Sequence, residues 1–267
     1  MSETARASYV YAVARPFGPD PLESVTGVGG YPVHLVVQDD LAAVVSTVPL
    51  HEFDADALKA NLEDLRWLEE VARAHHSVVE AAARATVAVP LRLATVYHSD
   101  DRVRTVLSDD YAVFDRALRR LTGRLEFGVK IYADPKVRAA APAPARQEQA
   151  PPDTSPGKAY LRKRRAQRER RDDTWQAAAD LVDRTDAALR EWSEARERHR
   201  PQDASLSGAA GENVLNAAYL VPEEHAANFL ATLERLRAEA PDGTRIDGSG
   251  PWAPYSFASL DQEGERT

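Results

Sequence analysis

The chain of 267 residues contains no cysteine. This absence excludes a disulfide framework, a thiolate metal site, an iron–sulfur cluster and a cysteine nucleophile, and it is typical of proteins in a reducing cytoplasm. No stretch approaches the roughly 18 apolar residues that a membrane-spanning helix needs, and the N-terminus lacks the pattern of a secretory signal. We therefore expect a cytoplasmic protein that has no membrane partner.

The chain also lacks an excess of positive charge, because 34 basic residues face 42 acidic ones and give a formal net charge of −8. Binding to nucleic-acid phosphates requires a basic surface, so the sequence as a whole predicts no nucleic-acid partner. The exception is a run at 158–171, where Glu169 is the single acid among eight basic residues. We select Arg162 and Arg165 from this run as candidate partner-binding residues.

This basic run has three interpretations. They are the solvated start of a helix, a docking surface for an acidic partner, and the contact region of a nucleic-acid-binding regulator. Proteins that bind single strands combine basic residues with aromatic stacking platforms, and no such platform accompanies the run. The first two interpretations are therefore favoured, and the regulator remains the alternative.

Common catalytic motifs are missing as well. The chain has no Walker sequence, no Gly-x-Ser-x-Gly and no His-Glu-x-x-His. His75, His76 and Glu80 share a predicted helix, but His75 falls on its apolar stripe, and a further ligand for zinc would have to come from a distant segment. We predict a core histidine, no metal, no cofactor and no catalysis, and an enzyme with an unrecognised site remains the alternative.

A stretch rich in proline and alanine, residues 135–156, offers almost nothing that could enter a core and predicts an extended loop. Strands and helices do not alternate regularly along the chain, which favours the α+β class. We expect two domains. An N-terminal α+β domain covers 1–123, and a ferredoxin-like domain covers 124–267, with the loop and a long, coiled-coil-like helix at 157–200 inserted into it.

Hydrophobic periodicity predicts the elements of both domains. The long helix carries an expected seam at Trp175, Ala178, Val182, Thr185, Leu189 and Trp192. The N-terminal domain is expected to contain strands at 9–14, 33–37, 41–45 and 86–97 and helices at 54–85 and 99–121. The C-terminal domain is expected to contain strands at 125–131, 212–221 and 244–246 and a helix that starts at Pro222.

The segment 250–257 combines prolines with aromatic residues. Pro251 and Pro254 restrict the backbone on either side of the aromatic side chains, so we select Trp252, Tyr255 and Phe257 as further candidate partner-binding residues. Rigidly held aromatic side chains are common anchors of protein interfaces. The competing interpretation is a structural lid that packs back over the C-terminal sheet.

Several segments, in the same order along nearly the whole chain, resemble the GvpL/GvpF family of gas vesicle accessory proteins. They are residues 9–13, 27–46, 75–76, 89–96, 127–132, 157–161, 216–221 and 250–257. The chain departs from the family at Ala94, where glycine is common, at Phe127, where tryptophan is common, and at Ala253, where a second proline is common.

This resemblance implies a two-domain protein with an α+β N-terminal domain and a modified ferredoxin-like C-terminal domain. It also implies a minor structural or assembly role in gas vesicles, with binding to the small hydrophobic shell protein or to other accessory proteins, and no catalysis. A cytoplasmic protein associated with gas vesicles is the corresponding location.

Overall fold

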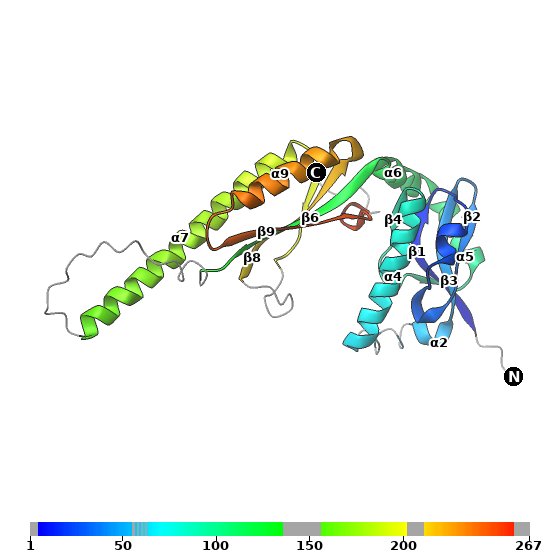
Figure 1. The fold of residues 1–267 in the computed structure, drawn as a ribbon. Helices are drawn as coiled ribbons and strands as arrows, with labels where there is room; N and C mark the ends of the chain where they lie inside the picture. Colours follow the sequence, from blue (N-terminus) through cyan, green and yellow to red (C-terminus); the bar gives the residue numbers. More distant parts are fainter. Residues whose placement is uncertain are drawn as a thin grey trace, which may run out of the picture. The chain divides into compact units, whose positions relative to one another are not determined.

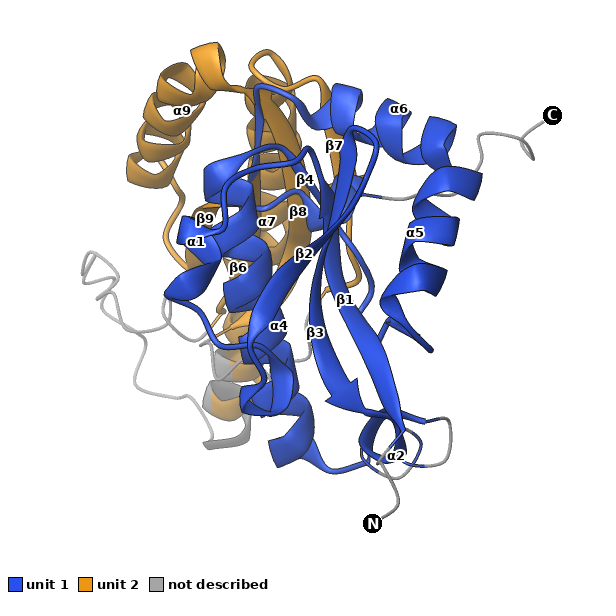
Figure 2. Cartoon of the chain, turned by 90° about the vertical axis from the view of Figure 1, so that its right-hand side faces the viewer, with its two compact units in different colours: residues 1–126, 252–267 blue, residues 127–251 orange. Residues whose placement is uncertain are grey.

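The computed structural model describes residues 5–54, 57, 59, 61, 63–135, 156–201 and 211–258. The chain divides into two compact units, of which unit 1 contains residues 1–126 and 252–267 and unit 2 contains residues 127–251 (Figure 2). The predicted division into 1–123 and 124–267 differs from this one mainly at the C-terminus, which belongs to unit 1. The predicted proline-rich loop lies almost entirely outside the described residues.

Unit 1 is built around an antiparallel sheet in the order β2-β3-β1-β4, with β5 also paired to β1. The strands are Arg6–Ala14 (β1), Val33–Gln38 (β2), Leu41–Pro49 (β3), Ala88–Pro90 (β4) and Val96–Tyr97 (β5). After Arg6, every residue of β1 is buried. A central strand that is buried throughout requires cover on both faces of the sheet.

Helices provide this cover on either side of the sheet (Figures 1 and 2). The helix α4 lies on one face, together with α1 and the short helix η1, while α5 and α6 lie on the other. Their bounds, with those of the short α2, are Asp20–Glu23 (α1), Val28–Gly30 (η1), Leu50–Phe53 (α2), Leu65–Ala85 (α4), Asp100–Asp109 (α5) and Tyr111–Leu121 (α6).

The start of α4 corrects the expected helix at 54–85. The Asp64 carboxylate accepts a hydrogen bond from the backbone N–H of Arg66 at 2.9 Å and so caps the helix that begins at Leu65. Asp54 instead accepts from the N–H of Ala57, also at 2.9 Å. Asp54 and Asp64 therefore each stabilise a local turn. The hydrophobic spacing alone does not show which of them precedes the long helix.

The expected strand at 86–97 is also corrected, because β4 and β5 are separated by a turn. In this turn Ala94 has a φ of 63°, in the left-handed region, which costs an L-residue roughly 1–2 kcal/mol. The backbone N–H of Ala94 donates to the Tyr9 hydroxyl at 3.0 Å, and the N–H of Thr95 donates to the Arg92 carbonyl. These contacts hold the strained conformation in place.

Buried polar groups connect β1 to its surroundings. The hydroxyls of Tyr9 and Tyr11, both fully buried, lie 3.0 Å from His75 Nδ1 and 2.8 Å from Ser46 Oγ respectively. The Tyr11 hydroxyl also accepts from the N–H of Val28 at 2.9 Å. His75 is thus the core histidine that the sequence predicts, and burial lowers its pKa to about 4, although the backbone carbonyl of Leu91 favours the protonated form.

Unit 2 contains a four-stranded sheet in the order β7-β8-β6-β9. Its elements are Arg124–Ala133 (β6), Pro156–Arg190 (α7), Ala195–Arg198 (β7), Glu212–Pro222 (β8), Glu223–His225 (η3), Ala226–Ala238 (α9) and Thr244–Trp252 (β9). The helices α7 and α9 lie side by side over one face of the sheet (Figure 1). The succession βαββαβ with this strand order is the ferredoxin-like arrangement, which is consistent with the expectation for this part of the chain.

The helix expected at 157–200 ends earlier, at Arg190. The strand β7 follows it and pairs antiparallel with β8, and the Asp186 carboxylate of α7 accepts from Arg196 of β7 and from the Tyr219 hydroxyl of β8. Residues 191–200 carry several charged side chains and lack apolar residues at helical spacing. Such a segment suits an edge strand, where charges oppose unwanted pairing.

The buried face of α7 is displaced by about one residue from the expected seam. Ala178, Thr185 and Leu189 are buried as predicted, whereas Trp175 and Val182 are only half-buried. Trp192, also half-buried, lies beyond the end of the helix. The residues that complete the buried stripe are Thr174 and Leu181. Trp175 flanks this stripe and Trp192 follows the helix, so including both large side chains in the hydrophobic pattern shifted the predicted face.

We expect the stability of unit 1 to fall as the pH decreases from about 6.5 towards 4. The folded chain keeps His75 neutral in this range while the unfolded chain binds a proton there, so the loss reaches about 3 kcal/mol at most. Urea unfolding followed between pH 7.5 and 4.5 measures it. His75→Gln should flatten the pH dependence relative to the unmodified chain. His98→Gln, which removes an exposed histidine, is the control. Equal slopes for the His75→Gln and unmodified chains would contradict this prediction.

Candidate functional site

The C-terminal tail, residues 252–258, is anchored to unit 1. Ala253 and Phe257 are buried, and Ala253 belongs to the same hydrophobic cluster as the buried residues of β1 and α4. The backbone N–H and the hydroxyl of Ser256 donate to the two carboxylate oxygens of Glu126 at 2.9 and 2.7 Å. The place of Ala253 in this cluster explains why the tail groups with unit 1.

The same tail exposes two aromatic side chains. Trp252 is 40% exposed and Tyr255, in the short helix η4 (Tyr255–Phe257), is 37% exposed. Both rings contact the imidazole of His76 on α4, with centroids 5.7 and 5.9 Å apart. We call these three residues the tail patch. Of the three predicted aromatic candidates, the structure therefore brings two together at the surface and turns Phe257 inward.

The carboxylate of Glu80 lies beside the tail patch. His76 Nε2 lies 3.7 Å from a carboxylate oxygen of Glu80, one turn further along α4. Burial of the Tyr255 hydroxyl, with the nearby negative charge of Glu80, raises the pKa of that phenol. Tyr255 is consequently a neutral hydrogen-bond donor, and the tail patch presents flat apolar rings with polar edges.

The second candidate surface is the start of α7, in unit 2. We call residues 158–171 the basic arm. Among the side chains described in it none is buried, and Arg162 and Arg165 are both exposed. Tyr160 and Leu161 are 59% and 66% exposed. Figure 1 shows this half of α7 running beyond the strands of its own unit.

Among the described side chains, the ion pair of the basic arm that the structure shows joins two of its own residues. Arg165 Nε lies 3.0 Å from Glu169, the arm's own acid. A helix segment in which no described side chain is buried gains little stability from packing on its own domain. Its exposure therefore favours a role in contacts with another molecule.

Within the described residues, no group of three or more histidine, aspartate or glutamate side chains could hold a metal ion. No helix in that part of the chain is long and apolar enough to cross a membrane. The candidate functional surfaces are therefore the tail patch and the basic arm.

Comparison with known proteins identifies the family. The profile of the family described as "Gas vesicle synthesis protein GvpL/GvpF" matches residues 7–259. The chain belongs to this family. It is 45% identical over 260 residues to Gas vesicle protein L of Streptomyces sp. (strain CB03234), which covers 97% of this chain and 96% of that relative. It is 26% identical over 247 residues to Gas vesicle protein L1 of Halobacterium salinarum, with 88% and 84% covered.

Solved structures support the same GvpL/GvpF fold. The crystal structure of GvpF from Anabaena sp. PCC7120 superposes with a TM-score of 0.68 at 20% identity and covers 98% of this chain and 100% of that one. GvpF from Microcystis aeruginosa gives 0.64 at 19% identity, with 95% and 99% covered. The predicted family and the predicted α+β class are confirmed, and family membership supports a gas vesicle accessory role.

His76 is the residue of the tail patch that the sequence did not reveal as a partner of Trp252. The contact joins residues 176 positions apart, and no local pattern predicts such a pair. The available signal was indirect, since His76 follows the buried His75 on the same helix and must therefore lie about 100° around from it, towards the surface.

We expect Phe257→Ala to lower the free energy of unfolding by about 3 kcal/mol, because it removes a buried ring from unit 1. Trp252→Ala should cost about 1 kcal/mol or less, because much of its ring already contacts water. Urea unfolding monitored by circular dichroism measures both values. Equal losses in the two variants would contradict the description of an anchored tail with an exposed patch.

Proposed function

We propose that this chain is a minor structural or assembly protein of gas vesicles that binds the hydrophobic shell protein through the tail patch and other accessory proteins through the basic arm. Membership of the GvpL/GvpF family supports the gas vesicle role. The observation that carries the binding role is the tail itself, which is anchored by Phe257 and Ser256 yet exposes Trp252 and Tyr255. The proposed location is the cytoplasm, in association with gas vesicles.

The anchored tail suits an apolar partner for a physical reason. Ordering a side chain or a loop on binding costs free energy, and a surface already held in one conformation avoids most of that cost. Tryptophan and tyrosine are enriched among the residues that contribute most to protein interfaces. A hydrophobic shell protein would therefore gain a rigid apolar contact without unfolding any part of unit 1.

The basic arm suits a different class of partner. Opposite charges increase the rate of encounter and select against partners of the same sign. Arg162 and Arg165 project from a helix segment in which no described side chain is buried, so an acidic accessory protein could approach from several directions. The proposed role is structural and requires no catalysis, and the nucleic-acid-binding regulator remains the competing function of the same arm.

We expect the double variant Trp252→Ala, Tyr255→Ala to reduce co-purification of the shell protein by about tenfold or more, since two interface anchors are lost. Its thermal unfolding midpoint should stay within a few degrees of the unmodified chain. Leu230→Ala is the matched control, because it removes an exposed apolar side chain from unit 2. Undiminished binding by the stable double variant would refute the tail patch as the shell-binding surface.

A second test addresses the basic arm. Reversing two charges with Arg162→Glu and Arg165→Glu should abolish binding to an acidic accessory protein of the vesicle, with purified accessory proteins tested one at a time, and should leave shell binding intact. Arg162→Lys with Arg165→Lys keeps the charge and serves as control. A mobility shift of random duplex DNA that weakens steeply with salt would instead support the regulator.

A further inference from the structure

The strand β2 forms an open edge of the unit 1 sheet, because β3 is its neighbour on one side and no described strand lies on the other. Gln38 pairs with Leu41 across the two-residue turn to β3. The direction of the hydrogen bonds alternates along an antiparallel strand, so the N–H and C=O groups of residues 33, 35 and 37 point away from β3. Among the described residues, no backbone hydrogen bond reaches these outward groups.

This edge differs from the other sheet edges of the described chain. In unit 2, the edge strand β7 has three charged side chains among its four residues, and β9 contains two charged residues and a proline. In unit 1, β4 is three residues long and ends at Pro90. Charges, prolines and short length all oppose pairing with another chain. β2 runs over six residues, Val33–Gln38, and contains no Asp, Glu, Lys, Arg or Pro.

The side chains of β2 leave a row of apolar groups incompletely covered. Val33 and Leu35 pack against the hydrophobic cluster of unit 1 but are only partly buried. Val37 shares their face, because side chains alternate along a strand, and it is 47% exposed. On the other face, the imidazole of His34 lies 3.1 Å from the Asp100 carboxylate. The open edge thus combines free backbone groups with apolar side chains that a further strand would cover.

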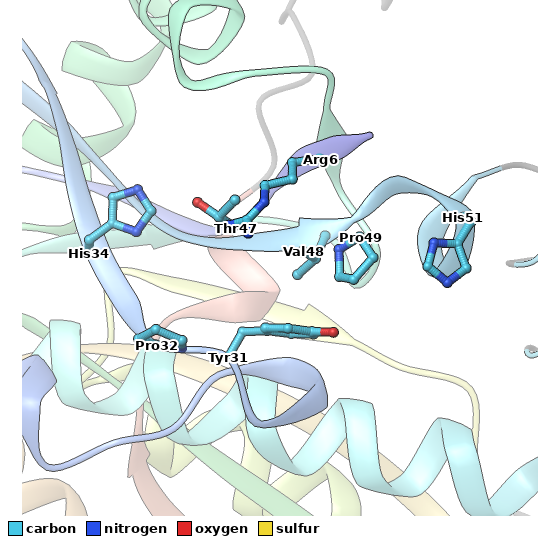
Figure 3. A pocket seen from close by; sticks show the side chains of 8 residues that line it. All are labelled: Arg6, Tyr31, Pro32, His34, Thr47, Val48, Pro49 and His51. Atoms are coloured by element: carbon cyan, nitrogen blue, oxygen red, sulfur yellow. The ribbon is translucent and has the colours of Figure 1, made fainter. Parts of the chain in front are cut away.

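Both ends of this edge are defined. The turn at residues 39–40 closes one end. At the other end, Pro32 has no N–H to donate, and Figure 3 shows the chain turning at Pro32 away from the line of the strand that carries His34. A cavity of about 480 Å³, lined in part by Pro32 and His34, lies at this turn. An added strand can therefore pair with residues 33–37.

Two copies of β2 are complementary when they run antiparallel about a two-fold axis at Leu35. Leu35 then lies opposite Leu35 of the second copy, and Val33 lies opposite Val37. The outward backbone groups of all three positions find partners, in about six hydrogen bonds. A shift of this register leaves Val33 or Val37 without a strand residue opposite it, so the centred register makes the most bonds. No like charges face each other, because the strand contains no Asp, Glu, Lys or Arg.

We propose that two copies of this chain associate through β2, so that their unit 1 sheets join into one antiparallel sheet. The partner has to offer an uncharged edge of matching length, and β2 of a second copy is such an edge. The two-fold pairing is closed, because it covers the open edge of both copies and leaves the short β4 outside.

The proposed dimer is weak and reversible. One strand from each chain forms a smaller contact than a standard interface, which buries roughly 1,200–2,000 Å², so we expect association at micromolar concentrations. This inference goes beyond the proposed function, since no residue of β2 belongs to the tail patch or the basic arm.

Sedimentation velocity of the full chain over a concentration series tests the association. We expect a shift from monomer to dimer between about 1 and 100 µM. Hydrogen exchange over the same series locates the contact, because the amides of residues 33, 35 and 37 should exchange more slowly as the dimer forms. The amides of residues 34 and 36 face β3 and serve as the internal control.

Substitution of one edge residue tests the strand pairing. Val37→Pro removes an outward N–H from each copy and should weaken the dimer about tenfold or more. Val37→Thr keeps the N–H and a branched side chain, so this control should associate like the unmodified chain. Circular dichroism and the thermal midpoint show whether both variants fold. If Val37→Pro does not fold, the exchange of the unmodified chain still decides the outcome.

The absence of cysteine from the chain allows a separate test of the register. A mixture of Val33→Cys and Val37→Cys chains should form a disulfide-linked pair on mild oxidation, since opposite residues of a hydrogen-bonded pair lie about 5.5 Å apart at Cα, within the range of a disulfide. Each variant alone should cross-link far less, because its two cysteines would lie about four residues apart along the paired strands.

A monomer at every concentration overturns the proposal, and so does a dimer in which the outward amides of β2 exchange as fast as in the monomer. Slow exchange of these amides that does not depend on protein concentration also overturns it, because the chain itself would then cover the edge. Slow exchange that appears only when purified shell protein or an accessory protein is added assigns the edge to that protein and overturns the second copy as its occupant.

Discussion

Two buried tyrosine hydroxyls on β1 are the constraint on which unit 1 depends. A buried hydroxyl without a hydrogen-bond partner costs about 1–3 kcal/mol, so the segments that surround Tyr9 and Tyr11 must supply partners at fixed positions. Those partners are His75 on α4, the backbone of Ala94, Ser46 on β3 and the backbone of Val28. The same constraint requires a glycine at position 27, because a Cβ there would lie 2.3 Å from the oxygen of the Tyr11 hydroxyl.

The sequence predicted correctly those parts of the fold that depend on interactions between residues close together along the chain. The strands expected at 33–37 and 41–45 and the helix expected to start at 99 were of this kind, since the two-residue turn between β2 and β3 and the capping hydroxyl of Ser99 act within a few residues. β7 was missed because its backbone is stabilised by β8, about twenty residues further along the chain. The turn at Ala94 was missed because its strain is offset by Tyr9, and the glycine common in the family at this position was the available hint of a left-handed residue.

The basic arm was predicted more completely than the tail patch, again because only the tail depends on residues far away in the sequence. Composition alone located the basic arm, because a run of like charges cannot be buried in a core. For the tail, composition identified the aromatic residues but not which of them face water. That outcome depends on Glu126 and His76, which are far from the tail in sequence and reach it through the fold. Because His75 faces the core, the next residue, His76, lies about 100° further around α4, where Trp252 can contact it.

The return of residues 252–258 to unit 1 makes unit 2 an insertion within a discontinuous domain. During synthesis on the ribosome, residues 1–126 therefore emerge long before the segment that completes their hydrophobic cluster. Until residues 253–257 leave the exit tunnel, the surface that Ala253 and Phe257 later cover remains exposed to water or to a chaperone. A chain that ends before residue 253 would keep that apolar surface uncovered, so Trp252 and Tyr255 can contact His76 only after unit 2 has been synthesised.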